Sequence, residues 1–196
     1  MSGLSRRDWG LGLLAAGCAL AARPARADWG LPQLMALLSR HGSGKASFVE
    51  KKYIALLDKP VESSGELLYR APDRLEKRTL APKPEAMVLQ GDTLTLERGA
   101  GRPIVLSLQQ YPELAAFTES IRATLAGDQQ ALERVYAVSL DGDEAHWTLT
   151  LRPLNERMAA AVERIVIGGS RGEVLRVEID QADRDRSVMT ITPAAS

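Results

Sequence analysis

The sequence predicts an α+β protein that is mainly β: a single curved antiparallel sheet of about ten short strands, with helices covering one face. Short segments in which apolar and polar residues alternate recur along the chain, separated by turn-forming Gly, Pro and Asp residues. This β pattern is interrupted near the start and in the middle, where apolar residues recur at helical spacing. No repeat or linker divides residues 28–196, so we expect one domain there.

The first 27 residues have the three zones of a secretory signal. Arg6 and Arg7 precede an uncharged run, and Ala25-Arg26-Ala27 places small residues where a signal peptidase cuts. The paired arginines also resemble the twin-arginine export motif. We therefore expect residues 1–27 to be a cleavable, twin-arginine-like signal and residues 28–196 to work outside the cytoplasm.

Cys18 is the only cysteine, and it lies within this signal. Residues 28–196 therefore have no disulfide, thiol nucleophile or thiolate metal ligand. The residues that end at Cys18 also resemble a lipoprotein cleavage site, which leaves an alternative open. If Cys18 is acylated instead of removed, the protein is a membrane-tethered acceptor.

Composition excludes two further classes of protein. Once the four arginines and one aspartate of the signal are removed, residues 28–196 have a net charge of −3. Nucleic-acid binding requires concentrated basic surface and often aromatic stacking platforms, whereas this chain has three Trp, four Tyr and two Phe. No other apolar run approaches the roughly 20 residues of a membrane span. We therefore expect neither nucleic-acid binding nor a membrane-spanning segment.

The first half of the chain predicts one helix and a series of strands. Leu31, Leu34, Leu37 and Leu38 have helical spacing and predict a short amphipathic helix that ends near His41. The strands that follow are predicted over residues 46–56, 66–70, 75–80, 87–90, 93–98 and 104–108.

The second half begins with helices and returns to strands. Apolar residues spaced by three or four predict a helix over residues 112–126, which Gly127 ends. Asp128 is expected to cap a second short helix that continues through Arg134. The remaining strands are predicted over residues 137–140, 146–152, 162–167, 174–179 and 187–192.

No motif in the sequence predicts catalysis. The two histidines, His41 and His146, belong to no spaced ligand set, and no nucleophile elbow or phosphate-binding loop is present. The acidic residues at 141–144 and 183–185 lack the spacing of a calcium loop and are predicted to be solvated turns. We expect a protein that is not an enzyme, with no metal and no cofactor.

Three segments resemble the periplasmic lipoprotein carriers of the LolA-like family. Residues 46–51 (Ala-Ser-Phe-Val-Glu-Lys) resemble the first strand of that family, residues 65–72 its Gly-x-Leu-x-x-x-x-Pro strand and turn, and residues 89–94 its next hairpin. The closing strands, from Trp147 to Thr192, follow in the same order. The resemblance implies an incomplete β-barrel of roughly ten or eleven strands, with helices covering a concave face that encloses an apolar cavity.

The resemblance also implies a location, the periplasm of a Gram-negative cell, and a function. Such a carrier shields the acyl chains of a lipoprotein or related amphiphile and passes them, as a monomer, from an inner-membrane transporter to an outer-membrane acceptor. Exposing an acyl chain to water costs about 0.8 kcal/mol per CH₂, so crossing an aqueous gap requires shielding. An alternative of another class stays open: a non-enzymatic envelope sensor or assembly subunit of the same fold, which binds a membrane-protein partner.

Strand parity predicts the residues of the cavity, with ordinary core packing of the same residues as the alternative. The expected cargo-binding residues are Leu67, Tyr69, Leu75, Met87, Leu89, Leu94, Leu96, Trp147, Leu149, Leu151, Ile165 and Ile167. The expected lid residues are Leu114, Phe117 and Ile121.

The strand over residues 75–80 departs from the family, because charged residues leave neither of its faces fully apolar. The functional Arg that the family places before its turn Pro falls on Ala71 here. The basic residues around this strand are candidate contacts to a polar head group, with a solvated strand face as the alternative. These candidates are Arg70, Arg74, Lys77 and Arg78.

Overall fold

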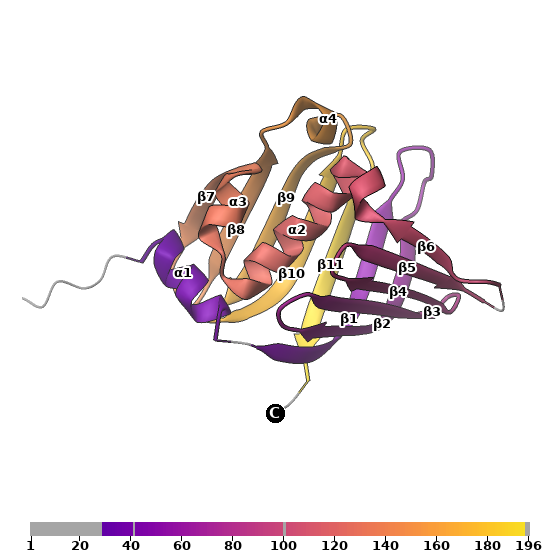
Figure 1. Cartoon of the computed structure of the whole chain (residues 1–196), viewed down its shortest axis with the longest axis horizontal. Helices are drawn as coiled ribbons and strands as arrows, with labels where there is room; N and C mark the ends of the chain where they lie inside the picture. Colours follow the sequence, from indigo (N-terminus) through magenta and orange to yellow (C-terminus); the bar gives the residue numbers. More distant parts are fainter. Residues whose placement is uncertain (1–28, 41, 100, 195–196) are drawn as a thin grey trace, which may run out of the picture.

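A computed structural model describes residues 29–40, 42–99 and 101–194. Eleven strands form one antiparallel sheet in the order β6-β5-β4-β3-β2-β1-β11-β10-β9-β8-β7. The first and last strands of the chain therefore pair at the centre, and the sheet stays open between its edge strands (Figure 1). The strands are β1 (Ser43–Tyr53), β2 (Val61–Arg70), β3 (Arg74–Ala81), β4 (Glu85–Gln90), β5 (Thr93–Arg98), β6 (Ile104–Ser107), β7 (Tyr136–Gly142), β8 (Trp147–Pro153), β9 (Val162–Ser170), β10 (Glu173–Gln181) and β11 (Arg186–Pro193).

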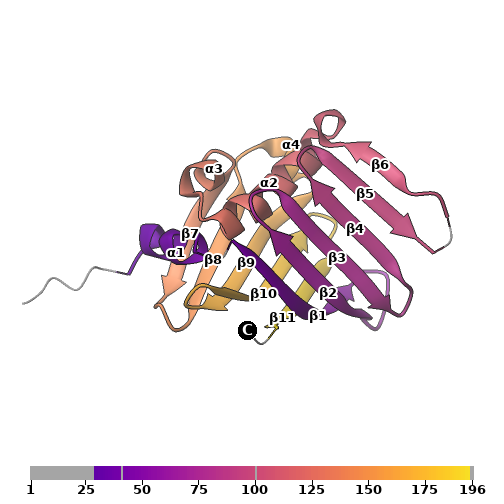
Figure 2. The same cartoon turned by 60° about the horizontal axis from the view of Figure 1, so that its bottom comes forward.

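The helices are α1 (Leu31–Leu38), the 3₁₀ turn η1 (Leu108–Gln110), α2 (Pro112–Ala126), α3 (Gln129–Glu133) and α4 (Glu156–Ala159). The segment from η1 to α3 connects the edge strands β6 and β7, and α2 crosses the concave side of the sheet, whereas α1 precedes β1 and α4 lies between β8 and β9 (Figures 1 and 2). The predicted fold class is confirmed: the protein is mainly β, with one curved, open antiparallel sheet and a few short helices. Among the described residues, no helix is long and apolar enough to cross a membrane.

Cross-strand register defines the two faces of the sheet. The partners Leu149, Ile167, Val177, Met189 and Glu50 follow one another from β8 to β1 and therefore share a face. We call this the inner face, because Leu149 and Ile167 pack in a core that also contains residues of α1 and α3. The opposite side is the outer face.

Two apolar clusters lie on the inner face. The larger one joins α1, α3 and α4 to β7, β8 and β9, and its residues include Leu34, Leu132 and Leu149, which have no accessible surface. The smaller one joins β4, β5 and η1 through Leu89, Leu94 and Leu108. Strands β3, β2, β1, β11 and β10 lie between the strands that carry the buried residues of these two clusters.

Some boundaries differ from those that local pattern predicts. The strand β2 begins at Val61, because Ser63-Ser64-Gly65 continues the ladder with β1 and does not form a turn. Gly65 adjoins a β-bulge between β2 and β3. A larger residue would not fit at position 65, because its Cβ would overlap the backbone of Arg78. The helix α4 was not predicted at all. It is a single turn, capped by the Asn155 side chain, which accepts hydrogen bonds from the next backbone amides.

Candidate ligand-binding face

The register places all twelve expected cavity residues on the inner face. Three rows of cross-strand partners carry most of them: Tyr69–Leu75–Leu89–Leu94, Leu67–Lys77–Met87–Leu96 and Leu151–Ile165. The members on β8 and β9 form one almost completely buried group. On β2 to β5, Tyr69, Leu89 and Leu94 are also buried, whereas Leu67, Leu75, Met87 and Leu96 stay half-buried.

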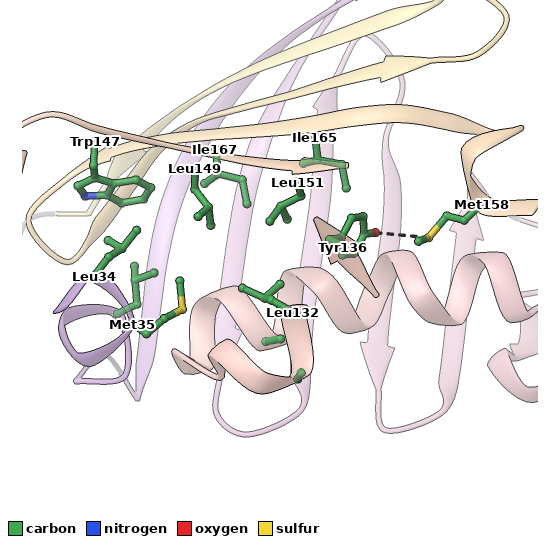
Figure 3. Close-up of a cluster of buried hydrophobic side chains, with 13 residues drawn as sticks. Leu34, Met35, Leu132, Tyr136, Trp147, Leu149, Leu151, Met158, Ile165 and Ile167 are labelled. Atoms are coloured by element: carbon green, nitrogen blue, oxygen red, sulfur yellow. Dashed lines mark hydrogen bonds between the residues drawn. The ribbon is translucent and has the colours of Figure 1, made fainter. Parts of the chain in front are cut away.

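The buried group forms the packed core under α1 and α3 (Figure 3). Trp147 donates a hydrogen bond from Nε1 to the carbonyl of Arg171 at 2.9 Å, and Gly169 leaves room for its ring. The Tyr136 hydroxyl donates to the sulfur of Met158 at 3.5 Å, and burial raises its pKa. The candidate residues on β8 and β9 are therefore part of the packed core. The apolar candidates that stay partly exposed lie on β2 to β5.

Helix α2 is hydrogen-bonded to the sheet through Arg122, which donates to the carbonyl of Gly91, in the turn between β4 and β5, at 3.1 Å. At the C-terminus of the helix, Asp128 N donates to the carbonyl of Ala123, where α2 leads into α3. Ile121, one of the three expected lid residues, is half-buried on this helix. The side chains of the other two, Leu114 and Phe117, lie outside the described residues.

A charged group lies on the inner face among these apolar residues. Lys77 Nζ donates to Glu50 Oε2 at 2.5 Å, and Ser187 donates to Glu50 Oε1 at 2.5 Å. Lys77 Nζ also lies 4.9 Å from the ring centroid of Phe48, in cation–π contact. Burial would raise the pKa of Glu50, but the hydrogen bonds from Lys77 and Ser187 outweigh it and hold that pKa below its usual value.

The four candidate head-group residues do not come together. Lys77 is on the inner face, whereas Arg70, Arg74 and Arg78 alternate with inner-face residues and project from the outer face. Arg74 and Arg78 pair there with Glu76, which is 4% exposed, and Arg74 also donates to Gln90. Because successive residues of a strand face opposite ways, the three arginines do not share the inner face with Lys77.

Sequence reasoning missed the partner of Lys77. Glu50 lies two residues after the buried Phe48, so strand parity would have placed it on the inner face. The pairing of β1 with β11, which brings Ser187 to Glu50, joins residues 137 positions apart and has no local signal.

The outer face has two grooves at the centre of the sheet. One, of about 470 Å³, is lined by residues of β1, β2, β3 and β11 that include Lys45, Glu66, Leu68 and Arg78. The other, of about 280 Å³, is lined by residues of β1, β10 and β11 that include Tyr53. Both have a mixed polar and apolar lining.

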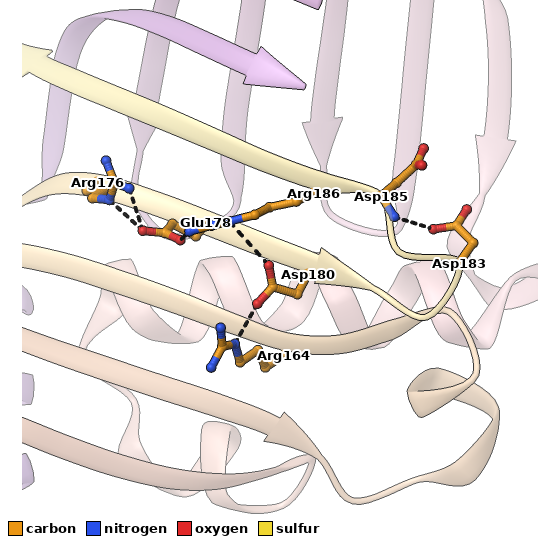
Figure 4. A network of polar contacts seen from close by, with 7 residues as sticks. All are labelled: Arg164, Arg176, Glu178, Asp180, Asp183, Asp185 and Arg186. Atoms are coloured by element: carbon orange, nitrogen blue, oxygen red, sulfur yellow. Dashed lines mark hydrogen bonds and ion pairs between the residues drawn. The ribbon is translucent and has the colours of Figure 1, made fainter. Parts of the chain in front are cut away.

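An ion-pair network continues across β9, β10 and β11 on the outer face (Figure 4). Glu178 is held between Arg176 and Arg186, whose hydrogen bonds outweigh the effect of burial and lower its pKa. Asp180 pairs with Arg164 at 2.5 Å. In the part of the chain that the structure describes, no group of three or more His, Cys, Asp or Glu residues could hold a metal ion.

Comparison with known proteins gives the family. Residues 19–195 match the family described as "Outer membrane lipoprotein carrier protein LolA-like". Since this match covers most of the chain, the protein belongs to the LolA-like family. No curated protein matches the sequence.

Several solved structures are similar to this fold. A LolA superfamily protein from Nitrosomonas europaea is 11% identical, with 83% of this chain and 89% of that chain covered and a TM-score of 0.46. A chain of the MucA/MucB complex of Pseudomonas aeruginosa is 15% identical, with a coverage of 85% and 56% and a TM-score of 0.48. A putative outer membrane lipoprotein-sorting protein domain from Vibrio parahaemolyticus is 10% identical, with a coverage of 82% and 88% and a TM-score of 0.41.

Proposed function

We propose that this protein is a periplasmic carrier, exported through a signal in residues 1–27, that shields the acyl chains of a lipoprotein or related amphiphile on its inner face. It passes this cargo from the inner membrane to the outer membrane. Membership of the LolA-like family supports a carrier of this kind.

The observation that carries the proposal is the partly open apolar surface on β2 to β5. Leu67, Met87 and Leu96 lie in one cross-strand row, with Leu75 in the next, and all four stay half-buried. An acyl chain laid along these rows would remove its own surface and theirs from water, at about 0.8 kcal/mol per CH₂. Helix α2 lies over the concave side and can cover such a chain (Figure 2).

Two adjacent residues of β2 provide a matched test. Leu67 and Leu68 are both half-buried, but the register places Leu67 on the inner face and Leu68 on the outer face. We expect Leu67→Gln to weaken binding of the lipophilic dye N-phenylnaphthylamine about fivefold or more, and Leu68→Gln to leave it unchanged. Acyl lipid that co-purifies with the exported protein should be detected by mass spectrometry. A protein that binds neither lipid nor dye would contradict the proposal.

A sensor or assembly subunit that binds a protein partner is the second candidate. The outer grooves favour it, because they offer charged and apolar groups together, as protein interfaces do. Ser47 lines the larger groove, so Ser47→Trp should release a partner seated there while leaving dye binding intact. A partner captured by cross-linking in the periplasm, lost in this variant and free of lipid would support the second candidate over the carrier.

A further inference from the structure

The charged cluster of Glu50, Lys77 and Ser187 lies on strands between the two apolar clusters of the inner face. Lys77 shares its cross-strand row with Leu67 and Met87, the half-buried residues of the proposed cargo surface. Its side chain is 22% exposed and that of Glu50 is 13% exposed. The cluster is therefore both next to the apolar surface and accessible from it.

Stability alone is a weak reason for such a pair. Removing two charges from water costs about as much as their attraction returns, and apolar residues of similar volume often serve a fold as well or better. The inner face is otherwise well suited to such residues, because Phe48, Met189 and Leu67 surround the pair in the register. A charged pair in this position is better explained by a ligand that it contacts.

The cluster has an excess of positive charge and free hydrogen-bond donors. Lys52 follows Glu50 by two residues on the same strand face, and its charge also helps to hold the pKa of Glu50 down. One carboxylate is thus opposed by two ammonium groups. An ammonium has three donors, and within the described ranges Glu50 is the one acceptor of a hydrogen bond from Lys77.

We propose that Lys77, oriented by Glu50 and Phe48, binds the anionic head group of the cargo, a carboxylate or a phosphate, while the acyl chain lies along Leu67 and Met87. The inference rests on the proposed carrier function and specifies its cargo class as an anionic amphiphile. Glu50 fixes the position of the ammonium and competes with the ligand for it, which keeps binding reversible, as a carrier requires.

The test compares oleate, oleyl phosphate and oleyl alcohol, which share one chain and differ in the head group. Each displaces N-phenylnaphthylamine from the exported protein. We expect both anions to bind at least about fivefold more tightly than the alcohol. Their ranking relative to each other distinguishes a carboxylate cargo from a phosphate cargo.

Four variants test whether Lys77 causes the preference for anionic head groups. Lys77→Met should remove it while leaving binding of the alcohol within about twofold, and Lys77→Arg should keep it. Glu50→Gln should strengthen the binding of both anions, because it removes the competing charge. Arg78→Met is the matched control, since Arg78 is the next residue of β3 but pairs with Glu76 on the outer face; it should change nothing.

The outcomes separate the inference from the function on which it rests. Equal affinity for all three amphiphiles in the unmodified protein, or a preference that survives in Lys77→Met, would overturn the inference and leave the carrier function standing. A protein that binds none of them would overturn both. The opposite effect expected of Glu50→Gln tests the inference even if Lys77→Met does not fold.

Discussion

At the scale of single residues, Glu50 shows how a carboxylate stays ionised on an apolar face. Burial disfavours its charge, and the hydrogen bonds from Lys77 and Ser187 more than compensate, so that its pKa lies below the ordinary value of 4.5. A lowered pKa in the folded state means that the unfolded state binds protons more readily. The contribution of this group to stability is therefore complete above its ordinary pKa and is lost as the pH falls through the lowered one.

Removing the charge should abolish this pH dependence. Between about pH 6 and about pH 3, the free energy of unfolding should fall more steeply for the unmodified protein than for Glu50→Gln, as measured by urea denaturation. Glu62→Gln is the control, because Glu62 forms a surface pair with Lys51 in which both side chains are about half exposed, and such pairs contribute little. Parallel pH profiles for Glu50→Gln and the unmodified protein would contradict this account of the pair.

Gly65 is a residue at which the fold requires the absence of a side chain. A Cβ at this position would overlap the carbonyl oxygen of Arg78 and lie 2.9 Å from Thr79 Cα, next to the bulge between β2 and β3. We expect Gly65→Ala to lower the free energy of unfolding by about 2 kcal/mol or more, as measured by urea denaturation. Gly44→Ala, in the neighbouring strand, has open space and should be near neutral. Equal effects of the two substitutions would show that β3 can move away at little cost.

At the scale of elements, the connection between α2 and α3 depends on local signals. Gly127 ends α2 in the left-handed conformation (φ 68°), and the Asp128 side chain then accepts a hydrogen bond from Ala131 N at 3.0 Å. We expect Asp128→Ala to cost about 1 kcal/mol of stability and Asp128→Ser, which retains a capping oxygen, to cost much less. Thermal unfolding of the two variants would measure the difference, and equal melting temperatures would contradict a capping role.

The elements that sequence predicts best are those with local causes. The bounds of α2, the Asp128 cap and the strand over residues 93–98 agree with the structure, because spacing, a left-handed glycine and strict alternation specify them. Two features were harder to predict. The extension of β2 back to Val61 depends on pairing with β1, and the helix α4 is a single turn with a side-chain cap, too short for a helical pattern to show.

The candidate site, too, is predicted only where local pattern determines it. Alternation alone places Leu67, Met87 and Leu149 on one face, as the register has them. It does not distinguish Leu149, buried under the helices, from Leu67, which stays half-buried, because that depends on which strands α1 and α3 cover. Nor could alternation predict the contact of Glu50 with Lys77, because Glu50 is on β1 and Lys77 is on β3, with β2 between them.

At the scale of the whole molecule, the open sheet suits a carrier that must both take up and release its cargo. Its edge strands, β6 and β7, lie at opposite ends of the strand order, so the sheet is not closed into a barrel. A carrier also has to be free to diffuse, which depends on how the N-terminus is processed.

The processed N-terminus tests that requirement. We expect the intact mass of the exported protein to correspond to a chain that begins at Asp28, and Cys18→Ala to leave both mass and export unchanged. A lipid-modified chain that begins at Cys18 would instead identify a membrane-tethered acceptor.

The central claim is that the inner face, and not the outer one, holds acyl chains. Met87 and Val88 are adjacent half-buried residues of β4 that point to the inner and outer face respectively. The most direct measurement places the photo-cross-linker benzoylphenylalanine at each position in exported protein within living cells. We expect lipid or lipoprotein adducts from position 87 and none from position 88. Adducts from position 88 alone, or a protein partner and no lipid from position 87, would contradict it.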